Sequence, residues 1–73
     1  MEEHQLELEQ SLSILTDMYN KAKKNKEPSF EVNAMIFDGL DTREHVRYFL
    51  SEVGHDVTVH YGFDITFTFR SPQ

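Results

Sequence analysis

The chain has 73 residues, a formal net charge of −6 and no cysteine. One domain over residues 1–73 is all that this length supports, and disulfides and thiolate metal sites are excluded. The acidic balance argues against nucleic-acid binding through a basic patch, no apolar run approaches the roughly 20 residues of a membrane helix, and the lack of cysteine makes the cytoplasm the expected compartment.

The first third of the chain fits two descriptions. In HQLELE, Leu6 and Leu8 alternate with polar residues, which is typical of a strand over residues 4–9. A helix could instead begin near Glu2, because one helical stripe runs through Leu8, Leu12, Leu15, Tyr19 and Ala22. We favour the strand, followed by a helix capped by Ser11 or Ser13, since a single long helix would leave the sheet with only three strands.

The segment SFEVNAMIF, residues 29–37, is predicted to be the next strand. Alternating residues give it one apolar face, made of Phe30, Val32, Ala34 and Ile36. Met35 and Phe37 lie on the other face beside polar residues, which predicts burial on both sides. The pair Asp38-Gly39 then indicates a turn.

A second helix is predicted over residues 42–53. Asp41 and Glu44 have the spacing of a capping box. The apolar stripe that follows consists of Val46, Phe49, Leu50 and Val53. Gly54 stands where a left-handed residue commonly ends a helix.

The last third predicts a β-hairpin. DVTVHY and FDITFTF both alternate apolar and polar residues, and Gly62 marks the turn between them. The expected order is therefore βαβαββ. Two amphipathic helices would lie on one face of a small mixed four-stranded sheet, which is a two-layer α+β sandwich.

Residues 42–57, TREHVRYFLSEVGHDV, resemble the second helix of the TusA/SirA-like sulfur-carrier family, whose pattern there is Thr-x-x-Asp-Ile-x-x-Phe-Cys-x-x-x-Gly-His-x-Leu. The positions that match in type and spacing are Thr42, Val46, Phe49, Gly54, His55 and Val57. His45 replaces the family's aspartate and Leu50 its frequent cysteine. The resemblance covers about residues 30–70, and it implies the βαβαββ fold.

The resemblance also implies where the family's chemistry would lie. Its sulfur-bearing cysteine begins a Cys-Pro-x-Pro motif at the start of the first helix, and the corresponding place here is about residues 13–16, Ser-Ile-Leu-Thr. A serine hydroxyl forms no persulfide. Sulfur relay by the family's route is therefore not expected in this chain.

Other chemistry has little support in the sequence. The four histidines are scattered, whereas a zinc site needs three or four convergent ligands. Serines with a histidine could form a nucleophile and base, but no nucleophile elbow is present. The three glycines are each accounted for by a turn or cap rather than a phosphate loop. We expect no metal, no cofactor and no enzymatic activity.

The function favoured by the sequence is a non-enzymatic interaction or regulatory module with a protein partner. The candidate surfaces are the first-helix N-terminus, with Ser11 and Ser13, and the open sheet face, with Met35, Phe37 and His60. The apolar spot on that face is open to three readings, which are partner binding, a homodimer contact or burial under the N-terminal segment. A small acidic inhibitor or nucleic-acid mimic, and an accessory subunit of a sulfur relay, are the alternatives.

Overall fold

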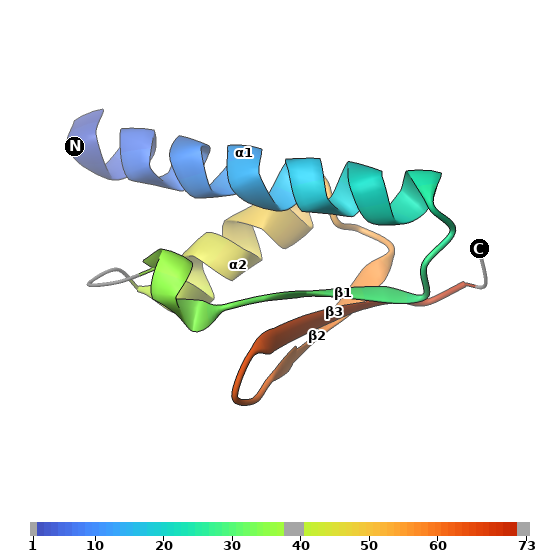
Figure 1. Cartoon of the computed structure of the whole chain (residues 1–73). Coiled ribbons are helices and arrows are strands. Elements are labelled where there is room, and N and C mark those ends of the chain that lie inside the picture. Colours follow the sequence, from blue (N-terminus) through green and yellow to red (C-terminus); the bar gives the residue numbers. More distant parts are fainter. Residues whose placement is uncertain (1, 38–40, 72–73) are drawn as a thin grey trace.

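The computed structural model describes residues 2–37 and 41–71. It is an α+β fold in which two helices cover one face of a three-stranded antiparallel sheet (Figure 1). In chain order the elements are α1 (Glu2–Lys24), β1 (Ser29–Val32), the 3-10 helix η1 (Ala34–Phe37), α2 (Thr42–Glu52), β2 (Val57–Tyr61) and β3 (Ile65–Phe69). The two-layer α+β architecture agrees with the sequence prediction, but the four-stranded sheet is not present among the described residues.

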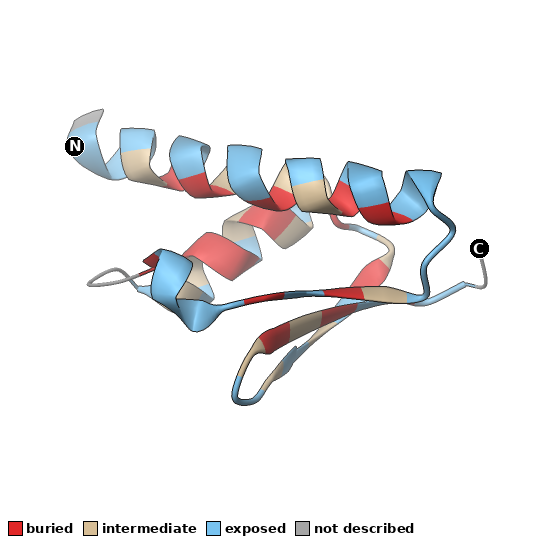
Figure 2. Ribbon diagram, viewed as in Figure 1, coloured by how far each residue is buried: buried red, intermediate tan, exposed pale blue. Residues whose placement is uncertain are grey.

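The prediction of a strand over residues 4–9 is wrong, because α1 is continuous from Glu2. Leu8 lies on the buried stripe that continues through Ser11, Leu15 and Tyr19, at three- and four-residue spacing (Figure 2). Leu6 lies on another side of the helix and is exposed. Among the described residues, no helix has both the length and the apolar character to span a membrane.

Helix α1 ends in a Schellman motif. The N–H of Glu27 donates to the carbonyl oxygen of Ala22 at 2.9 Å, and the N–H of Lys26 donates to that of Lys23 at 3.1 Å. Lys26 occupies the left-handed position with φ of 57°, where glycine is usual. Three lysines in or near the last turn, Lys21, Lys23 and Lys24, complement the negative end of the helix.

The strand predicted over residues 29–37 ends at Val32. Asn33 then bends the chain, since its side-chain oxygen accepts from the N–H of Met35 at 2.8 Å and its carbonyl oxygen accepts from the N–H of Ile36 at 3.1 Å. The chain continues as η1, which buries Phe37 and leaves Met35 exposed. The predicted turn at Asp38-Gly39 lies outside the described residues.

The sheet has the order β1-β3-β2, and both pairings are antiparallel. The predicted mixed sheet is therefore corrected, since the strand expected over residues 4–9 belongs to α1. The predicted hairpin is confirmed: Val57 pairs with Phe69 at one end and Tyr61 with Ile65 at the turn. Phe63 lies in this turn and is fully exposed.

The predicted second helix is confirmed, with Glu52 as its last residue. Asp41 is the N-cap, and its side chain accepts from the N–H of Glu44 at 3.3 Å. The Glu44 carboxylate itself contacts His4 of α1, 2.9 Å away. Gly54 does not have the predicted left-handed backbone; a Cβ there would lie 2.5 Å from Cε2 of Phe49, so glycine is required by the close approach of that ring.

Aromatic rings from α1, α2, β1 and β3 form the centre of the core. Phe30 of β1 stacks on Phe67 of β3, with ring centroids 4.9 Å apart. Phe49 of α2 meets Phe67 edge-on at 5.4 Å, and Tyr19 of α1 meets Phe49 edge-on at 5.9 Å. These rings fix both helices on the same face of the sheet.

Candidate functional site

The five residues proposed from the sequence do not form one site. Ser11 is buried in the middle of α1 and is no helix cap, and Phe37 is buried in the core. Ser13, Met35 and His60 are exposed, on α1, η1 and β2 respectively. The expectation that Met35 and Phe37 share an open sheet face is wrong, because the sheet ends before both of them.

Ser11 instead forms a buried hydrogen bond with His45 of α2, over 2.7 Å between Oγ and Nδ1. The single hydroxyl proton is donated to the carbonyl oxygen of Leu8 at 3.0 Å. Ser11 Oγ therefore accepts the Nδ1–H of His45. The imidazole is also packed against the ring of Phe37, with centroids 5.9 Å apart.

A serine beside a histidine is the arrangement of a nucleophile and its base. Here both side chains are almost fully buried, so a substrate in solution has no direct path to the Ser11 oxygen. What the pair does is satisfy two polar groups between the helices. It fixes the N-terminal half of α1 against α2.

A second polar contact between the helices lies on the surface. The hydroxyl of Tyr48 donates to the Glu9 carboxylate at 3.0 Å and accepts from the Gln5 amide at 3.2 Å. The Gln5 hydrogen bond alone would lower the pKa of Tyr48. The Glu9 hydrogen bond, partial burial and the charges of Glu9 and Glu52 together outweigh it and raise the pKa. Gln5 and Glu9 thus form one margin of the α1 surface that contacts α2, which also includes His4 and Ser11.

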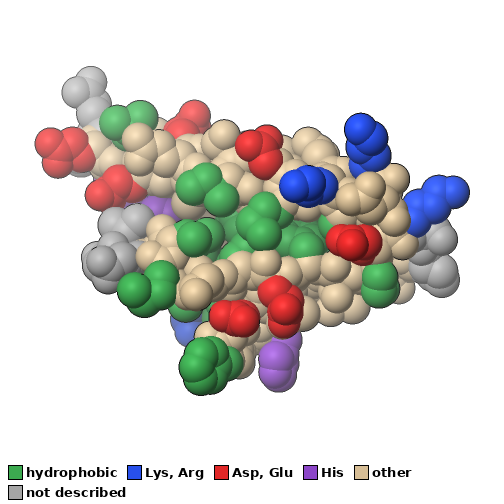
Figure 3. All heavy atoms as spheres, in the orientation of Figure 1, with side chains coloured by type: hydrophobic (Ala, Val, Ile, Leu, Met, Phe, Trp, Pro, Cys, Tyr) green, Lys and Arg blue, Asp and Glu red, His purple; other side chains and the backbone are tan. Residues whose placement is uncertain are grey.

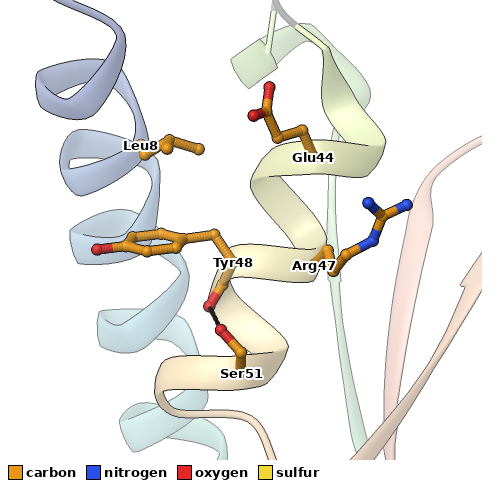
Figure 4. A pocket seen from close by; sticks show the side chains of 5 residues that line it. All are labelled: Leu8, Glu44, Arg47, Tyr48 and Ser51. Carbon is orange, nitrogen blue, oxygen red and sulfur yellow. Dashed lines mark hydrogen bonds between the residues drawn. The ribbon is translucent and has the colours of Figure 1, made fainter. Parts of the chain in front are cut away.

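A shallow hollow of about 350 Å³ opens beside this contact, lined by Leu8, Glu44, Arg47, Tyr48 and Ser51. In Figure 4 the phenol ring of Tyr48 extends across it toward α1, whereas Arg47 points away toward the sheet. The Ser51 hydroxyl is occupied by the Tyr48 carbonyl oxygen at 3.0 Å. The lining side chains do not converge on a common point, so the hollow lacks the arrangement that fixes a small ligand.

The other end of α1 is joined to the start of the hairpin through Asp56. Its carboxylate accepts from the Tyr19 hydroxyl at 2.7 Å and forms an ion pair with Lys23 at 3.1 Å. Burial alone would raise the pKa of Asp56, but the Tyr19 and Lys23 hydrogen bonds and the lysine charge together lower it. The pKa of Lys23 is raised by hydrogen bonding to Tyr19 and to Asp56. The cluster therefore links α1 to the start of the hairpin, and Tyr19 also belongs to the aromatic core.

Exposed apolar side chains lie on α1 beside its buried stripe and on η1. Ile14 is 45% exposed, and Met35 and Ile36 of η1 are 72% and 39% exposed. Met18, one turn after Ile14, is partly buried against the core. We call Ile14, Met18, Met35 and Ile36 the apolar flank. Figure 3 shows hydrophobic side chains gathered along the seam between α1 and β1, which is the face seen there.

The strand below this flank, β1, is at an edge of the sheet. Because Phe69 donates to the carbonyl oxygen of Pro28 at 3.0 Å, the alternation of antiparallel pairs turns the backbone groups of Phe30 and Val32 toward β3. Those of Ser29 and Glu31 then point to the free edge. A short edge with a charged residue resists strand addition, so the side chains of the flank, rather than the strand edge, are the accessible feature.

Among the described residues, the other large apolar side chains that are exposed are Leu6, on another side of α1, and Phe63, in the hairpin turn. The sheet face opposite the helices carries Glu31, Thr58, His60 and Thr68, as the alternation predicted. In residues 2–37 and 41–71, no group of three or more metal-ligating side chains is close enough to hold an ion.

No protein-family model, curated protein or solved structure matches this chain. The comparisons therefore indicate no role for the flank, and a role is inferred only from its exposure and geometry.

Two features of the helices were not predicted from the sequence. Ile14 was not singled out as exposed, because helical spacing places it beside the apolar stripe without showing how far the core covers it. The Ser11–His45 contact was not predicted either. A serine inside an apolar helical stripe is a signal that a polar partner faces it, and this signal was available in the sequence.

Proposed function

We propose that this chain is a non-enzymatic protein-interaction module that binds a protein through the apolar flank. The observation that carries this proposal is the exposure of Ile14, Met35 and Ile36, together with the hydrophobic side chains that gather along the seam between α1 and β1 (Figure 3). Exposed apolar side chains that gather on one face of a small protein are typical of an interaction surface. Two fixed helices would present such a surface without rearrangement.

The rigidity of the scaffold supports the same proposal. Ile14 and Met18 of the flank belong to α1, which is held against α2 by the Ser11–His45 hydrogen bond and against the hairpin by Asp56. A preorganised surface avoids part of the entropy cost of binding. The scaffold is proposed to be related to the TusA/SirA-like family over residues 30–70, without its sulfur-carrying cysteine, and to work in the cytoplasm.

Site-specific photocrosslinking in the native cell tests the proposal. A photoreactive residue at position 14 should crosslink to a protein, whereas the same residue at position 13 should not, because Ser13 is exposed on a different side of α1. A photoreactive residue at position 35 should crosslink to the same protein, and Ile14→Lys should remove that crosslink. Equal crosslinking from positions 13 and 14, or none from either, would contradict the proposal.

Salt separates this proposal from an acidic mimic. Binding through apolar side chains should survive about 0.5 M salt, at which charge interactions are strongly screened. A complex that dissociates in salt and is competed by DNA would favour the nucleic-acid mimic instead.

A further inference from the structure

We propose that the partner bound by the flank is a second copy of this chain, packed with its α1 antiparallel to the first and with Ile14 at the two-fold axis. This inference rests on the proposed function and names its partner. It is carried by the order of side chains along one side of α1, which is complementary to itself when reversed.

The side of α1 concerned is fixed by contacts on its other sides. Leu8 and Leu15 face the core, and Gln5 and Glu9 face α2 through Tyr48. At 100° per residue, positions 7, 14, 18 and 21 fall within a sector of about 60°. This sector borders the buried stripe of α1 on the side away from Gln5 and Glu9. Ile14 and Met18 of the apolar flank therefore share one line with Glu7 and Lys21.

Glu7, Ile14 and Lys21 follow one another at seven-residue intervals. That spacing drifts by only about 20° per step on a straight helix, so the three side chains form a narrow row. The row begins with an acid, has an apolar centre and ends with a base. In Figure 3, α1 correspondingly shows acidic side chains toward its N-terminal end and lysines toward its C-terminal end.

A two-fold axis at Ile14 converts this order into pairs. Glu7 and Lys21 are equally distant from Ile14 along the chain. Glu7 of each chain therefore lies opposite Lys21 of the other chain, and the two Ile14 side chains pack against each other at the axis. Within the described part of the chain, neither Glu7 nor Lys21 has an ion-pair partner. Lys21 is exposed and Glu7 is half-buried. Both charges can therefore pair with an incoming helix, and they select the antiparallel orientation over the parallel one.

The size of the surface is sufficient for a weak to moderate dimer. A helix of 23 residues is about 35 Å long. Two such helices packed along their length, with the exposed side chains of η1 beside them, approach the roughly 800 Å² per partner of a standard interface. A two-fold contact of this kind closes on itself and predicts dimers rather than filaments.

Charge-reversal variants test the pairing. Sedimentation velocity of the purified chain should show a dimer. Glu7→Lys places lysines opposite each other and Lys21→Glu does the same with glutamates, so each variant should weaken the dimer on the order of tenfold. Mixing the two variants restores opposite charges at both ends, so native mass spectrometry should detect a mixed dimer in preference to either variant paired with itself. Glu52→Lys on α2 is the control. It makes the same change in net charge as Glu7→Lys, and it should leave the dimer unchanged.

A second pair of variants tests the apolar centre. Ile14→Lys should weaken the dimer about 100-fold, because it brings two lysines together at the axis. Leu6→Lys, an exposed position on another side of α1, should not. A strictly monomeric chain up to about 1 mM would overturn the inference, as would a dimer that Glu7→Lys, Lys21→Glu and Ile14→Lys leave intact.

The failure of this inference can be told from the failure of the proposed function. A monomeric chain whose position 14 crosslinks to another protein keeps the flank as a binding surface and rejects the second copy. A monomeric chain with no crosslink from position 14 rejects both.

Discussion

Ser11 Oγ lies 2.7 Å from His45 Nδ1, and this buried contact joins two helices across 34 positions of the chain. Each group satisfies the other at a place that water does not reach. Together with the Tyr48–Glu9 hydrogen bond and the edge-on packing of Tyr19 on Phe49, this contact fixes the orientation of α1 on α2.

Ser11→Ala should therefore destabilise the fold. It leaves the Nδ1–H of His45 buried without an acceptor, which costs about 1–3 kcal/mol. Urea unfolding at neutral pH measures the loss. Ser13→Ala is the matched control, since Ser13 is exposed on the same helix, and it should change the free energy of unfolding by less than about 0.5 kcal/mol. Equal effects of the two substitutions would show that the Ser11–His45 contact contributes nothing.

Gly54→Ala should also be destabilising, for a steric reason. The new Cβ would lie 2.5 Å from Cε2 of Phe49, whose ring is fully buried and has no room to move. We expect a loss of about 2 kcal/mol in chemical unfolding. At Gly62 the nearest atom to an added Cβ is 3.6 Å away, so Gly62→Ala should be close to neutral. Phe49→Leu, combined with Gly54→Ala, should recover part of the steric cost; full additivity would contradict the explanation.

The two glycines also show what the sequence could and could not predict. Gly54 was recognised as the end of a helix and Gly62 as a turn, because both follow periodic segments. The reason for Gly54 was wrong: it is the ring of Phe49 rather than a left-handed backbone. Local patterns identify where an element ends, but a contact made by a side chain five residues earlier appears only once the helix is packed.

The difference between local pattern and packing also explains which parts of the sheet were predicted correctly. The hairpin and α2 were predicted because alternation and helical spacing are each unambiguous there. HQLELE fits both the two-residue period of a strand and the 3.6-residue period of a helix. The preference for a fourth strand led to the wrong prediction there. The flank could not be derived from the periodicity either, because the exposure of Ile14, beside the buried stripe, depends on how far the packed core covers α1.

The stability of the fold should depend on pH through Asp56. Its pKa in the folded protein is lowered below the ordinary 3.8, so the ionised carboxylate stabilises the fold above pH 3.8. That contribution is lost as the pH falls through the folded pKa. Tyr19→Phe removes a hydrogen bond to the carboxylate. It should raise the pKa of Asp56, as followed by NMR titration of the carboxyl carbon.

The same substitution should lower the free energy of unfolding at pH 7 by about 1 kcal/mol. Its effect should shrink as the pH falls through the lowered folded pKa of Asp56, because the carboxyl group is then protonated in both proteins. Tyr61→Phe is the control, because Tyr61 is partly buried and lies in the hairpin away from Asp56. An unchanged pKa of Asp56 in Tyr19→Phe would remove the hydrogen bond as its cause.

Substitution of Leu6 and Leu8 tests whether the chain begins with a helix, because a strand would place both side chains on the same face. In a strand over residues 4–9, Leu6 and Leu8 would share one face, and substitution by alanine would have similar effects. In α1 they lie 200° apart, and the exposed fractions are 57% for Leu6 and 7% for Leu8. Leu8→Ala should therefore cost about 2–3 kcal/mol in chemical unfolding, and Leu6→Ala less than about 0.5 kcal/mol. Similar losses for both would indicate a strand, in which case α1 would be too short to place Glu7 opposite the Lys21 of a second copy.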